Sequence, residues 1–226
     1  MKILAKTYYK LLDFLATLLM NLSKLVGNQY TFIWPYLHQS SFDHRFDYLR
    51  GIDNYSWYER PIFALEKIKP FGDVLDIGCG DGIYSGLFYY KKAKHIDAID
   101  LDKLAIEHAK KHYFRSNVNF KCIKIQDWLK KRKKYDTILM FNVIEHFDYE
   151  DGIKILKNVR TSLNENGLFF GSTVLFSDKG EHNFEHKNEF FSQANLRKYL
   201  KKVFRRVDIY TSIWPNGQKG CYFSCS

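Results

Sequence analysis

The sequence is poor in cysteine and in proline, with four of each among 226 residues. The cysteines include no C-x-x-C pair, so their spacing indicates neither a disulfide framework nor a metal-binding cluster. Thiols that stay reduced are typical of the cytoplasm, and we expect a cytoplasmic protein. Internal repeats and low-complexity tracts are also absent, and the 46% of hydrophobic residues excludes a disordered chain.

Long uninterrupted apolar runs are missing as well. The most apolar stretch, residues 11–20, contains Asp13, and it is too short and too polar to predict a membrane span. Lys2 and Lys6 precede this stretch as they would in a signal peptide, but no cleavage site of small residues follows. The sequence therefore predicts neither a secretory signal nor a transmembrane helix.

The first 26 residues carry one regular apolar stripe. The spacing of its residues alternates between four and three, which predicts an amphipathic helix over residues 2–26. The stripe consists of Leu4, Tyr8, Leu11, Leu15, Leu18, Leu22 and Leu25, and it is widened by Leu12, Leu19 and Val26. Gly27 and Asn28 predict the end of this helix, so residues 1–28 form a first segment. Three roles remain open for it: packing on the rest of the chain, homodimerisation, or a peripheral membrane contact.

Positive charge exceeds negative charge by 10, from 35 Lys and Arg against 25 Asp and Glu. Part of this excess lies in two basic runs, within residues 130–134 and 201–206. Such runs either bind an anionic partner, such as nucleic acid or membrane headgroups, or form a solvated surface. We favour the solvated surface, because no nucleic-acid-binding module accompanies the runs.

A glycine-rich turn is the most informative motif that is present. Residues 74–82 read VLDIGCGDG, a short apolar run followed by three alternating glycines. The apolar run predicts a buried parallel strand, and the glycines let the backbone turn sharply and approach a ligand closely. A helix expected over residues 82–91 would direct its N-terminus at the same place. Together these features predict a nucleoside-binding site.

A second acid stands in register with this turn. Asp100 ends the expected strand 95–100 and lies 22 positions after Gly78. In doubly wound folds, an acid about 20 residues beyond the glycine turn accepts hydrogen bonds from ribose hydroxyls. The sixth position of the dinucleotide fingerprint G-x-G-x-x-G is Ile83 here, so the pattern departs from that of NAD-binding proteins.

Strands and helices alternate from Pro61 onward, over a domain of residues 61–226. The alternation predicts a doubly wound α/β fold in which most strands are parallel. We expect strands near residues 73–77, 95–100, 118–124, 135–141 and 167–174, and helices near residues 82–91, 102–113, 149–163 and 193–201. Two final strands, 203–211 and 220–224, have no helix between them and should pair antiparallel. The aromatic-rich residues 29–60 would form a lid over a site or cover apolar surface.

These motifs give the chain a family resemblance. From about residue 55 to residue 226 it resembles the class I S-adenosylmethionine-dependent methyltransferases. The resemblance rests on VLDIGCGDG at 74–82, AID at 98–100, QDW at 126–128 and YDTILMFNVIEH at 135–146. The last segment is similar to that of small-molecule enzymes such as the ubiquinone-pathway O-methyltransferases. With residues 42–48 and 186–192, the whole chain looks like methyltransferases of bacterial surface-polysaccharide and glycan gene clusters.

The resemblance implies a seven-stranded sheet and a site for S-adenosyl-L-methionine. Asp100 would hold the ribose hydroxyls, Asp127 would accept a hydrogen bond from the adenine amino group, and Trp128 would lie beside the ring or in the core. Asn142 would face the methionine part. The cofactor-binding residues expected in this way are Asp76, Gly78, Cys79, Gly80, Gly82, Asp100, Leu101, Asp127, Trp128 and Asn142.

Catalysis is expected directly after the fourth strand. His146 is the candidate general base, since an imidazole titrates near neutral pH, or it orients the segment. Glu145, directly before it, is the second candidate catalytic residue. His182 and His186 lie in a polar loop where we expect the acceptor to bind. In related quinone-pathway enzymes an acid-rich version of the fourth-strand segment is linked to a divalent metal, but Asn142 replaces an acid here, and we expect no metal.

We therefore expect an O-methyltransferase that acts on a small polar or glycan-linked acceptor. The rival hypothesis is a nucleic-acid methyltransferase that uses the basic runs. Amino-directed enzymes of that kind usually carry Asn/Asp-Pro-Pro-aromatic after the fourth strand, whereas residues 142–145 read NVIE. Nucleic acid is thus not the expected partner, and a non-catalytic cofactor-binding module is the least favoured alternative.

Overall fold

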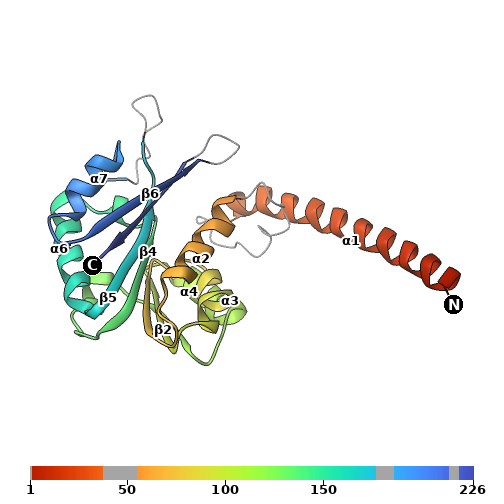
Figure 1. Ribbon diagram of the computed structural model, residues 1–226, viewed down its shortest axis with the longest axis horizontal. Coiled ribbons are helices and arrows are strands. Elements are labelled where there is room, and N and C mark those ends of the chain that lie inside the picture. The colour runs from red at the N-terminus through yellow and green to blue at the C-terminus, as the bar shows by residue number, and fades with distance from the viewer. Residues whose placement is uncertain (1, 38–54, 177–185, 214–218) are drawn as a thin grey trace. The chain divides into compact units, whose positions relative to one another are not determined.

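The computed structural model describes residues 2–37, 55–176, 186–213 and 219–226 (Figure 1). The chain divides into two compact units, Met1–Trp57 and Tyr58–Ser226, and each is described by itself. Within the described residues, no helix is both long enough and apolar enough to cross a membrane.

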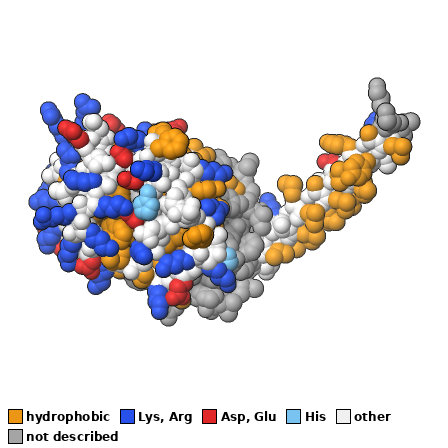
Figure 2. All heavy atoms as spheres, turned by 90° about the horizontal axis from the view of Figure 1, so that it is seen from below, with side chains coloured by type: hydrophobic (Ala, Val, Ile, Leu, Met, Phe, Trp, Pro, Cys, Tyr) orange, Lys and Arg blue, Asp and Glu red, His pale blue; other side chains and the backbone are white. Residues whose placement is uncertain are grey.

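The first unit is dominated by one long helix, α1 (Lys2–Leu37). It continues through Gly27 and Asn28, so the predicted end at these residues is wrong. A glycine inside a helix costs only about 1 kcal/mol relative to alanine, which a 36-residue helix tolerates. The large hydrophobic side chains of its first 26 residues that the structure describes are exposed, and Figure 2 shows them along the face of α1 turned to the viewer.

The expected lid segment, residues 29–60, is helical at both ends. Its first residues belong to α1, and its last residues begin α2 (Tyr55–Lys67); residues 38–54 lie outside the described part. Two bonds join α2 to the sheet, since Glu59 Oε2 accepts from Ser212 Oγ at 2.8 Å and from the Tyr222 hydroxyl at 2.9 Å.

The second unit is built on a seven-stranded sheet with the strand order β3-β2-β1-β4-β5-β7-β6 (Figure 1). The strands are β1 (Asp73–Ile77), β2 (His95–Asp100), β3 (Val118–Cys122), β4 (Tyr135–Phe141), β5 (Leu163–Thr173), β6 (Val207–Ile213) and β7 (Lys219–Cys225). The first five pair in parallel, and β7 is antiparallel to both β5 and β6. The predicted doubly wound sheet with an antiparallel ending is confirmed.

Helices cover both faces of this sheet, with α6 and α7 on one side and α3 and α4 on the other (Figure 1). The helical elements are α3 (Ile83–Leu87), η2 (Tyr89–Lys91), α4 (Lys103–His112), α5 (Ile125–Leu129), η3 (Ile144–His146), α6 (Tyr149–Ser162) and α7 (Gln193–Leu200). The strand order reverses between β1 and β4, so a ligand site is expected beyond the carboxyl ends of these two strands.

Local departures from the predicted elements concern four segments, one of which is the strand expected over 203–211 and observed as β6 at Val207–Ile213. The helix expected over 82–91 is divided into α3 and η2, and β5 begins at Leu163 rather than at 167. The third strand ends at Cys122 and is followed by α5, in which Ile125, Trp128 and Leu129 are buried. These three residues have helical spacing on one face, which explains why the chain turns into a short helix there.

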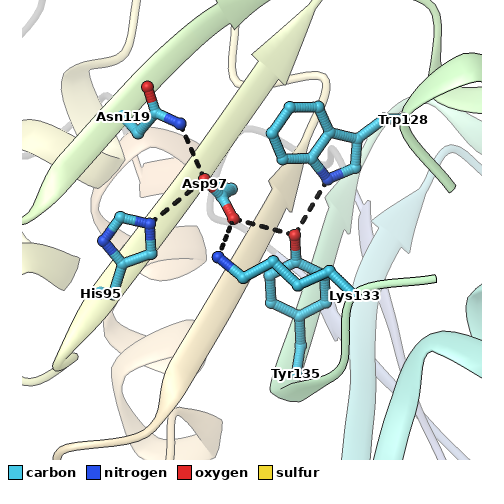
Figure 3. A network of polar contacts seen from close by, with 6 residues as sticks. All are labelled: His95, Asp97, Asn119, Trp128, Lys133 and Tyr135. Carbon is cyan, nitrogen blue, oxygen red and sulfur yellow. Dashed lines mark hydrogen bonds and ion pairs between the residues drawn. The ribbon is translucent and has the colours of Figure 1, made fainter. Parts of the chain in front are cut away.

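Asp97 of β2 is the centre of a buried polar network (Figure 3). Its Oδ2 accepts from Lys133 Nζ at 2.6 Å and from the Tyr135 hydroxyl at 2.9 Å. Its Oδ1 accepts from Asn119 Nδ2 at 2.9 Å and lies 3.2 Å from His95 Nε2. Burial raises the pKa of Asp97, but the bonds from Lys133, Asn119 and Tyr135 outweigh it and hold the pKa below its usual value. This carboxylate is fully used by the fold.

Side chains of the basic run 130–134 make contacts with the Asp97 network and with neighbouring helices. Lys133 belongs to the Asp97 network, Lys131 lies over the Trp128 ring at 3.8 Å, and Lys130 pairs with Asp127 at 2.7 Å. Lys134 Nζ donates to the Thr161 carbonyl at 2.5 Å, at the end of α6. Four of the five cations therefore make contacts within the chain, which agrees with the interpretation of this run as surface structure.

Candidate active site

The glycine turn after β1 has the backbone geometry that only glycine adopts easily. Gly78, Gly80 and Gly82 have φ angles of +72°, +54° and +78°. A Cβ at Gly78 would lie 2.2 Å from Val143 Cγ2, and one at Gly82 would lie 2.6 Å from Phe120 Cε1. A Cβ at Gly80 would have no described atom within 4 Å. The outer glycines are thus required by packing, whereas Gly80 faces open space.

Asp100 fastens this turn to the end of β2. Its Oδ2 accepts from the Gly80 amide at 2.8 Å, and its Oδ1 accepts from the Asp102 amide at 2.9 Å. A carboxylate has about four lone-pair sites, so each oxygen keeps capacity for a further donor such as a ribose hydroxyl. The geometry fits the predicted role and adds a second one, because Asp100 also orders the turn.

Two other expected cofactor residues support the turn from within the protein. Asp76 is buried and accepts from Ser85 Oγ at 2.7 Å, which joins β1 to α3. Burial raises the pKa of Asp76 to about 6, the Ser85 bond lowers it and the nearby Asp100 raises it. Burial likewise raises the pKa of the Cys79 thiol, which therefore stays protonated. Their positions indicate support of the turn.

A cavity of about 540 Å³ opens beside the turn, at the ends of β1, β2 and β4. Its volume lies within the range of small-molecule sites, about 300–1,000 Å³. The residues that line it are Ile77, Gly78, Ile99, Asp100, Leu101, Ile123, Lys124, Ile125, Gln126, Phe141, Asn142, Val143, His146 and Phe147. Five predicted site residues are among them: Gly78, Asp100, Leu101, Asn142 and His146.

Asp127 and Trp128 lie elsewhere, because α5 turns them away from this cavity. The Asp127 side chain is half exposed and pairs with Lys130. Trp128 is buried in the core, where its indole N–H donates to the Tyr135 hydroxyl at 3.0 Å. Trp128 thus takes the core position that the sequence left open, and neither Asp127 nor Trp128 lines the cavity. The cavity wall is instead formed by residues 123–126, which sequence reasoning missed, although the carboxyl end of the third strand was the place to search.

Asn142 occupies a strained position at the end of β4. Its φ is +52°, a left-handed conformation that asparagine tolerates better than most residues. The side-chain Oδ1 accepts from Ser172 Oγ at 2.8 Å, and the backbone amide donates to the Ser172 carbonyl at 2.9 Å. These bonds hold the chain in the turn that brings η3, with Glu145 and His146, to the cavity.

Glu145 is fully buried directly behind His146. Its Oε2 accepts from Thr173 Oγ1 at 3.0 Å, while Oε1 is buried and has no hydrogen-bond partner among the described residues. Burial raises the pKa of Glu145, and a hydrogen bond from its own backbone, the attraction of His146 and the bond from Thr173 offset this only in part. An incompletely paired buried carboxylate is costly, so this one indicates a functional site.

Backbone bonds bring a distant histidine to the same place. The Glu145 carbonyl accepts from the amides of Lys187 and Asn188 at 2.9 and 3.1 Å. The ring centroids of His146 and His186 are consequently 5.0 Å apart. One potential ligand atom each from Glu145, His146 and His186 lie within 4.8 Å of one another. His182, the other predicted acceptor residue, lies outside the described residues.

This cluster supplies two kinds of chemistry. An imidazole at the cavity wall, backed by a buried carboxylate, is the arrangement of a general base that is held in one orientation. Two imidazoles and one carboxylate also form a donor set that suits a divalent transition metal. Asn142 in place of an acid predicted no metal here, and the proximity of His186 to Glu145 and His146 has no signal in the sequence.

Comparison with known proteins agrees with the fold and the cavity. A family model described as a methyltransferase domain matches residues 48–224. The tRNA U34 carboxymethyltransferase of Campylobacter fetus is 29% identical over 136 residues, 57% of this chain and 48% of that protein. The mitochondrial ubiquinone biosynthesis O-methyltransferase of Saccharomyces cerevisiae is 34% identical over 113 residues, 47% of this chain and 35% of that protein. The chain thus spans half or less of the length of these relatives.

A solved structure with a similar fold is that of DhpI bound to SAH. It has a TM-score of 0.61 and 18% sequence identity, and the match covers 92% of this chain and 94% of that one. At this identity the likeness concerns the fold. Because the methyltransferase-domain model spans most of the sequence, the chain belongs to this family, the S-adenosylmethionine-dependent methyltransferases.

Proposed function

We propose that this chain methylates a hydroxyl group of a small polar or glycan-linked acceptor, with His146 as the general base. The observation that carries the proposal is the position of His146. It lines the cofactor cavity, stands beside the end of β4, and has the buried Glu145 and His186 within reach. A hydroxyl acceptor needs such a base, because it must lose a proton as the methyl group is transferred.

The cofactor would bind across the carboxyl ends of β1, β2 and β4. Asp100 would accept hydrogen bonds from the ribose, and the backbone at Gly78 and Asn142 would face the methionine part. Leu101 and residues 123–126 would enclose the adenine, a role that we assign to them in place of Asp127 and Trp128. S-adenosylmethionine brings an activated methyl group on its sulfonium, so the protein's main task is alignment of the acceptor.

The proton of the acceptor would pass to His146. Glu145 would hold the imidazole in one orientation and stabilise the imidazolium that forms, since a carboxylate beside a charged histidine lowers its energy. Burial raises the pKa of Glu145, so keeping this carboxylate ionised beside His146 requires free energy. His186, whose ring centroid lies 5.0 Å from that of His146, would contact the acceptor next to the base.

The test measures release of S-adenosylhomocysteine with surrogate acceptors such as catechols and sugar nucleotides. His146→Ala should lower kcat by about 10²–10⁴-fold and leave cofactor affinity, measured by calorimetry, nearly unchanged. His112→Ala, at the end of α4 and outside the cavity, is the matched control. If His146→Ala retains the wild-type kcat and pH profile, His146 is not the base and the proposal fails.

A divalent metal offers a second way to activate the same hydroxyl. Glu145 Oε1 without a partner and the three ligand atoms within 4.8 Å fit such an ion. Glu145, His146 and His186 would hold it, and it would lower the pKa of a bound hydroxyl. Chelation followed by addition of Zn²⁺ or Mn²⁺ separates the two mechanisms, since a metal-dependent enzyme loses activity on chelation and a simple histidine base does not.

The nucleic-acid alternative is favoured by one comparison, the relative named as a tRNA carboxymethyltransferase. It is weakened by the contacts within the basic run, where Lys130, Lys131, Lys133 and Lys134 are occupied by the chain itself. Incubation of the enzyme with labelled cofactor and total RNA, alongside cell-wall and capsular polysaccharide fractions, distinguishes the alternatives. Transfer of label to RNA alone would overturn the proposed acceptor class.

A further inference from the structure

The helix α1 carries an apolar surface that the cofactor site does not explain. Its exposed hydrophobic residues include Leu11, Leu15, Leu18 and Leu22, with exposed fractions between 41% and 53%, and Leu4 at 77%. Figure 2 shows such side chains following one another along the helix. Apolar surface on this scale is not left in water by a stable protein, so it marks an interaction surface.

The pattern on this surface is a heptad repeat. Written as abcdefg, the a positions are Tyr8, Leu15, Leu22 and Gln29, and the d positions are Leu4, Leu11, Leu18, Leu25 and Phe32. The e positions hold Ala5, Leu12, Leu19 and Val26. The five charged residues of α1 are Lys2, Lys6, Lys10, Asp13 and Lys24, and all of them occupy b, c or f positions. Every charge therefore lies off the a, d, e and g face.

The period of the repeat favours another helix as the partner. A straight α-helix drifts by about 20° per heptad against a strict seven-residue repeat, so over four heptads the a/d stripe winds around the helix axis. A second helix that supercoils with α1 can follow that stripe. A lipid surface needs only one apolar face and imposes no seven-residue repeat.

The stripe is long enough for an extended helix–helix contact. A helix of 36 residues is about 54 Å long at 1.5 Å per residue, and the stripe from Leu4 to Phe32 covers about 42 Å of it. A second copy of α1 has the same length and the same apolar positions. The two apolar faces can therefore pair along their whole length.

We propose that α1 is an assembly helix, in which two or more copies of this chain associate through the a, d and e positions. The apolar e positions make the face broader than the two-residue seam of a simple dimeric coiled coil, which is typical of helices in bundles. The absence of charge at the e and g positions removes the electrostatic selection that would favour a different partner helix. The site chemistry proposed above does not depend on this assembly.

The first measurement is sedimentation equilibrium on the full-length chain over a range of concentrations. The expected result is a single species whose mass is an integral multiple of 26.9 kDa. A monomer at every concentration would overturn the proposal, and so would a continuous distribution of aggregates.

Paired variants show whether α1 is the interface. Leu11→Lys with Leu18→Lys places two charges at d positions and should move the association midpoint to a protein concentration ~100-fold higher. Thr17→Lys with Ser23→Lys adds the same charge at c and b positions and should leave the midpoint unchanged. Circular dichroism and cofactor binding check that both variants fold. Association that survives the d-position change would overturn α1 as the interface.

Flotation with vesicles of phosphatidylcholine and phosphatidylglycerol distinguishes the lipid alternative. The assembled wild-type chain should stay with the soluble fraction, because its apolar face is already buried. If the wild-type chain is monomeric without vesicles and floats with them, its partner is a lipid surface and the proposal is overturned.

Discussion

Two buried carboxylates of the second unit, Asp97 and Glu145, differ in how completely they are hydrogen-bonded. Asp97 is 2% exposed, and both of its oxygens have two neighbouring polar groups. Glu145 is 0% exposed, and one of its oxygens has no hydrogen-bond partner among the described residues. Burial alone therefore does not distinguish structure from function. The completeness of the hydrogen bonding does, because an unsatisfied buried group persists only where something else requires it.

The two groups should also respond to pH in opposite directions. The pKa of Asp97 is lowered in the folded protein, so its contribution to stability is present above its unfolded pKa and is lost as pH falls through the folded value. The pKa of Glu145 is raised, so its contribution is present below its unfolded pKa and is lost as pH rises through the folded value. Thermal unfolding of the wild type, Asp97→Asn and Glu145→Gln across a range of pH measures this difference in pH dependence.

The largest effect is expected from Asp97→Ala. It leaves the Tyr135 hydroxyl and Asn119 without their acceptor and should lower the free energy of unfolding by about 2–4 kcal/mol. Chemical denaturation measures this change. Asp97→Asn keeps an acceptor oxygen and should therefore lower the free energy of unfolding by less than Asp97→Ala does. Equal stability of Asp97→Ala and wild type would show that the network is not structural.

Asp100 is intermediate between the two cases, since it serves the fold and faces the cavity. Asp100→Ala should weaken cofactor binding by at least about tenfold to 100-fold, the equivalent of one hydrogen bond to a charged acceptor at about 1.5–3 kcal/mol. Part of that loss will come from a loosened turn, which has lost the acceptor for the Gly80 amide. Asp100→Asn keeps one oxygen for that amide and separates the two effects by calorimetry. Unchanged affinity in both variants would remove Asp100 from the site.

Glu145→Gln tests whether the incompletely hydrogen-bonded carboxylate lowers the stability of the protein. Replacing a buried, incompletely paired carboxylate by an amide should raise stability near pH 8 by about 0.5–2 kcal/mol while it lowers kcat. Differential scanning calorimetry and the turnover assay are run on the same sample. A variant that is both less stable and fully active would place Glu145 with Asp97, as a structural acid.

The smallest effect is expected from Lys130→Met. Lys130, which follows the last residue of α5, forms an exposed pair with Asp127. The side chains are 75% and 50% exposed, and such pairs contribute little to stability. The melting temperature and the cofactor affinity should both stay at the wild-type values. A clear loss of cofactor affinity would show that the Lys130–Asp127 pair contributes to cofactor binding, as the sequence predicted for Asp127.

The sequence predicts the elements that depend on local pattern. The apolar run and glycines at 74–82, Asp100 in register and the alternation of strands and helices all follow from short-range spacing, and the structure confirms them. The end predicted for the first helix at Gly27 and Asn28 was wrong, because a single glycine weakens a helix without ending it. Trp128 could not be assigned from sequence, since its partner Tyr135 meets it only through the packing of α5 on the sheet.

The cluster around Glu145 shows where sequence reasoning ends. His146 was found from its position after the fourth strand, but its proximity to His186 depends on two backbone bonds to the Glu145 carbonyl. Forty residues separate the two histidines in the chain, and neither carries a local signal for the other. Contacts of this kind are set by how loops return to the sheet, and only the structure gives them.

The contact between Gly78 and Val143 has a consequence for anyone who wishes to change the acceptor of this enzyme. A Cβ at position 78 would lie 2.2 Å from Val143 Cγ2, so the glycine turn and the segment that carries His146 share one space. A library that randomises residues 142–147 for new substrates is therefore expected to disturb the glycine turn whenever position 143 becomes larger. Libraries that keep valine there, or allow only alanine, should retain far more active members than those that vary the whole segment.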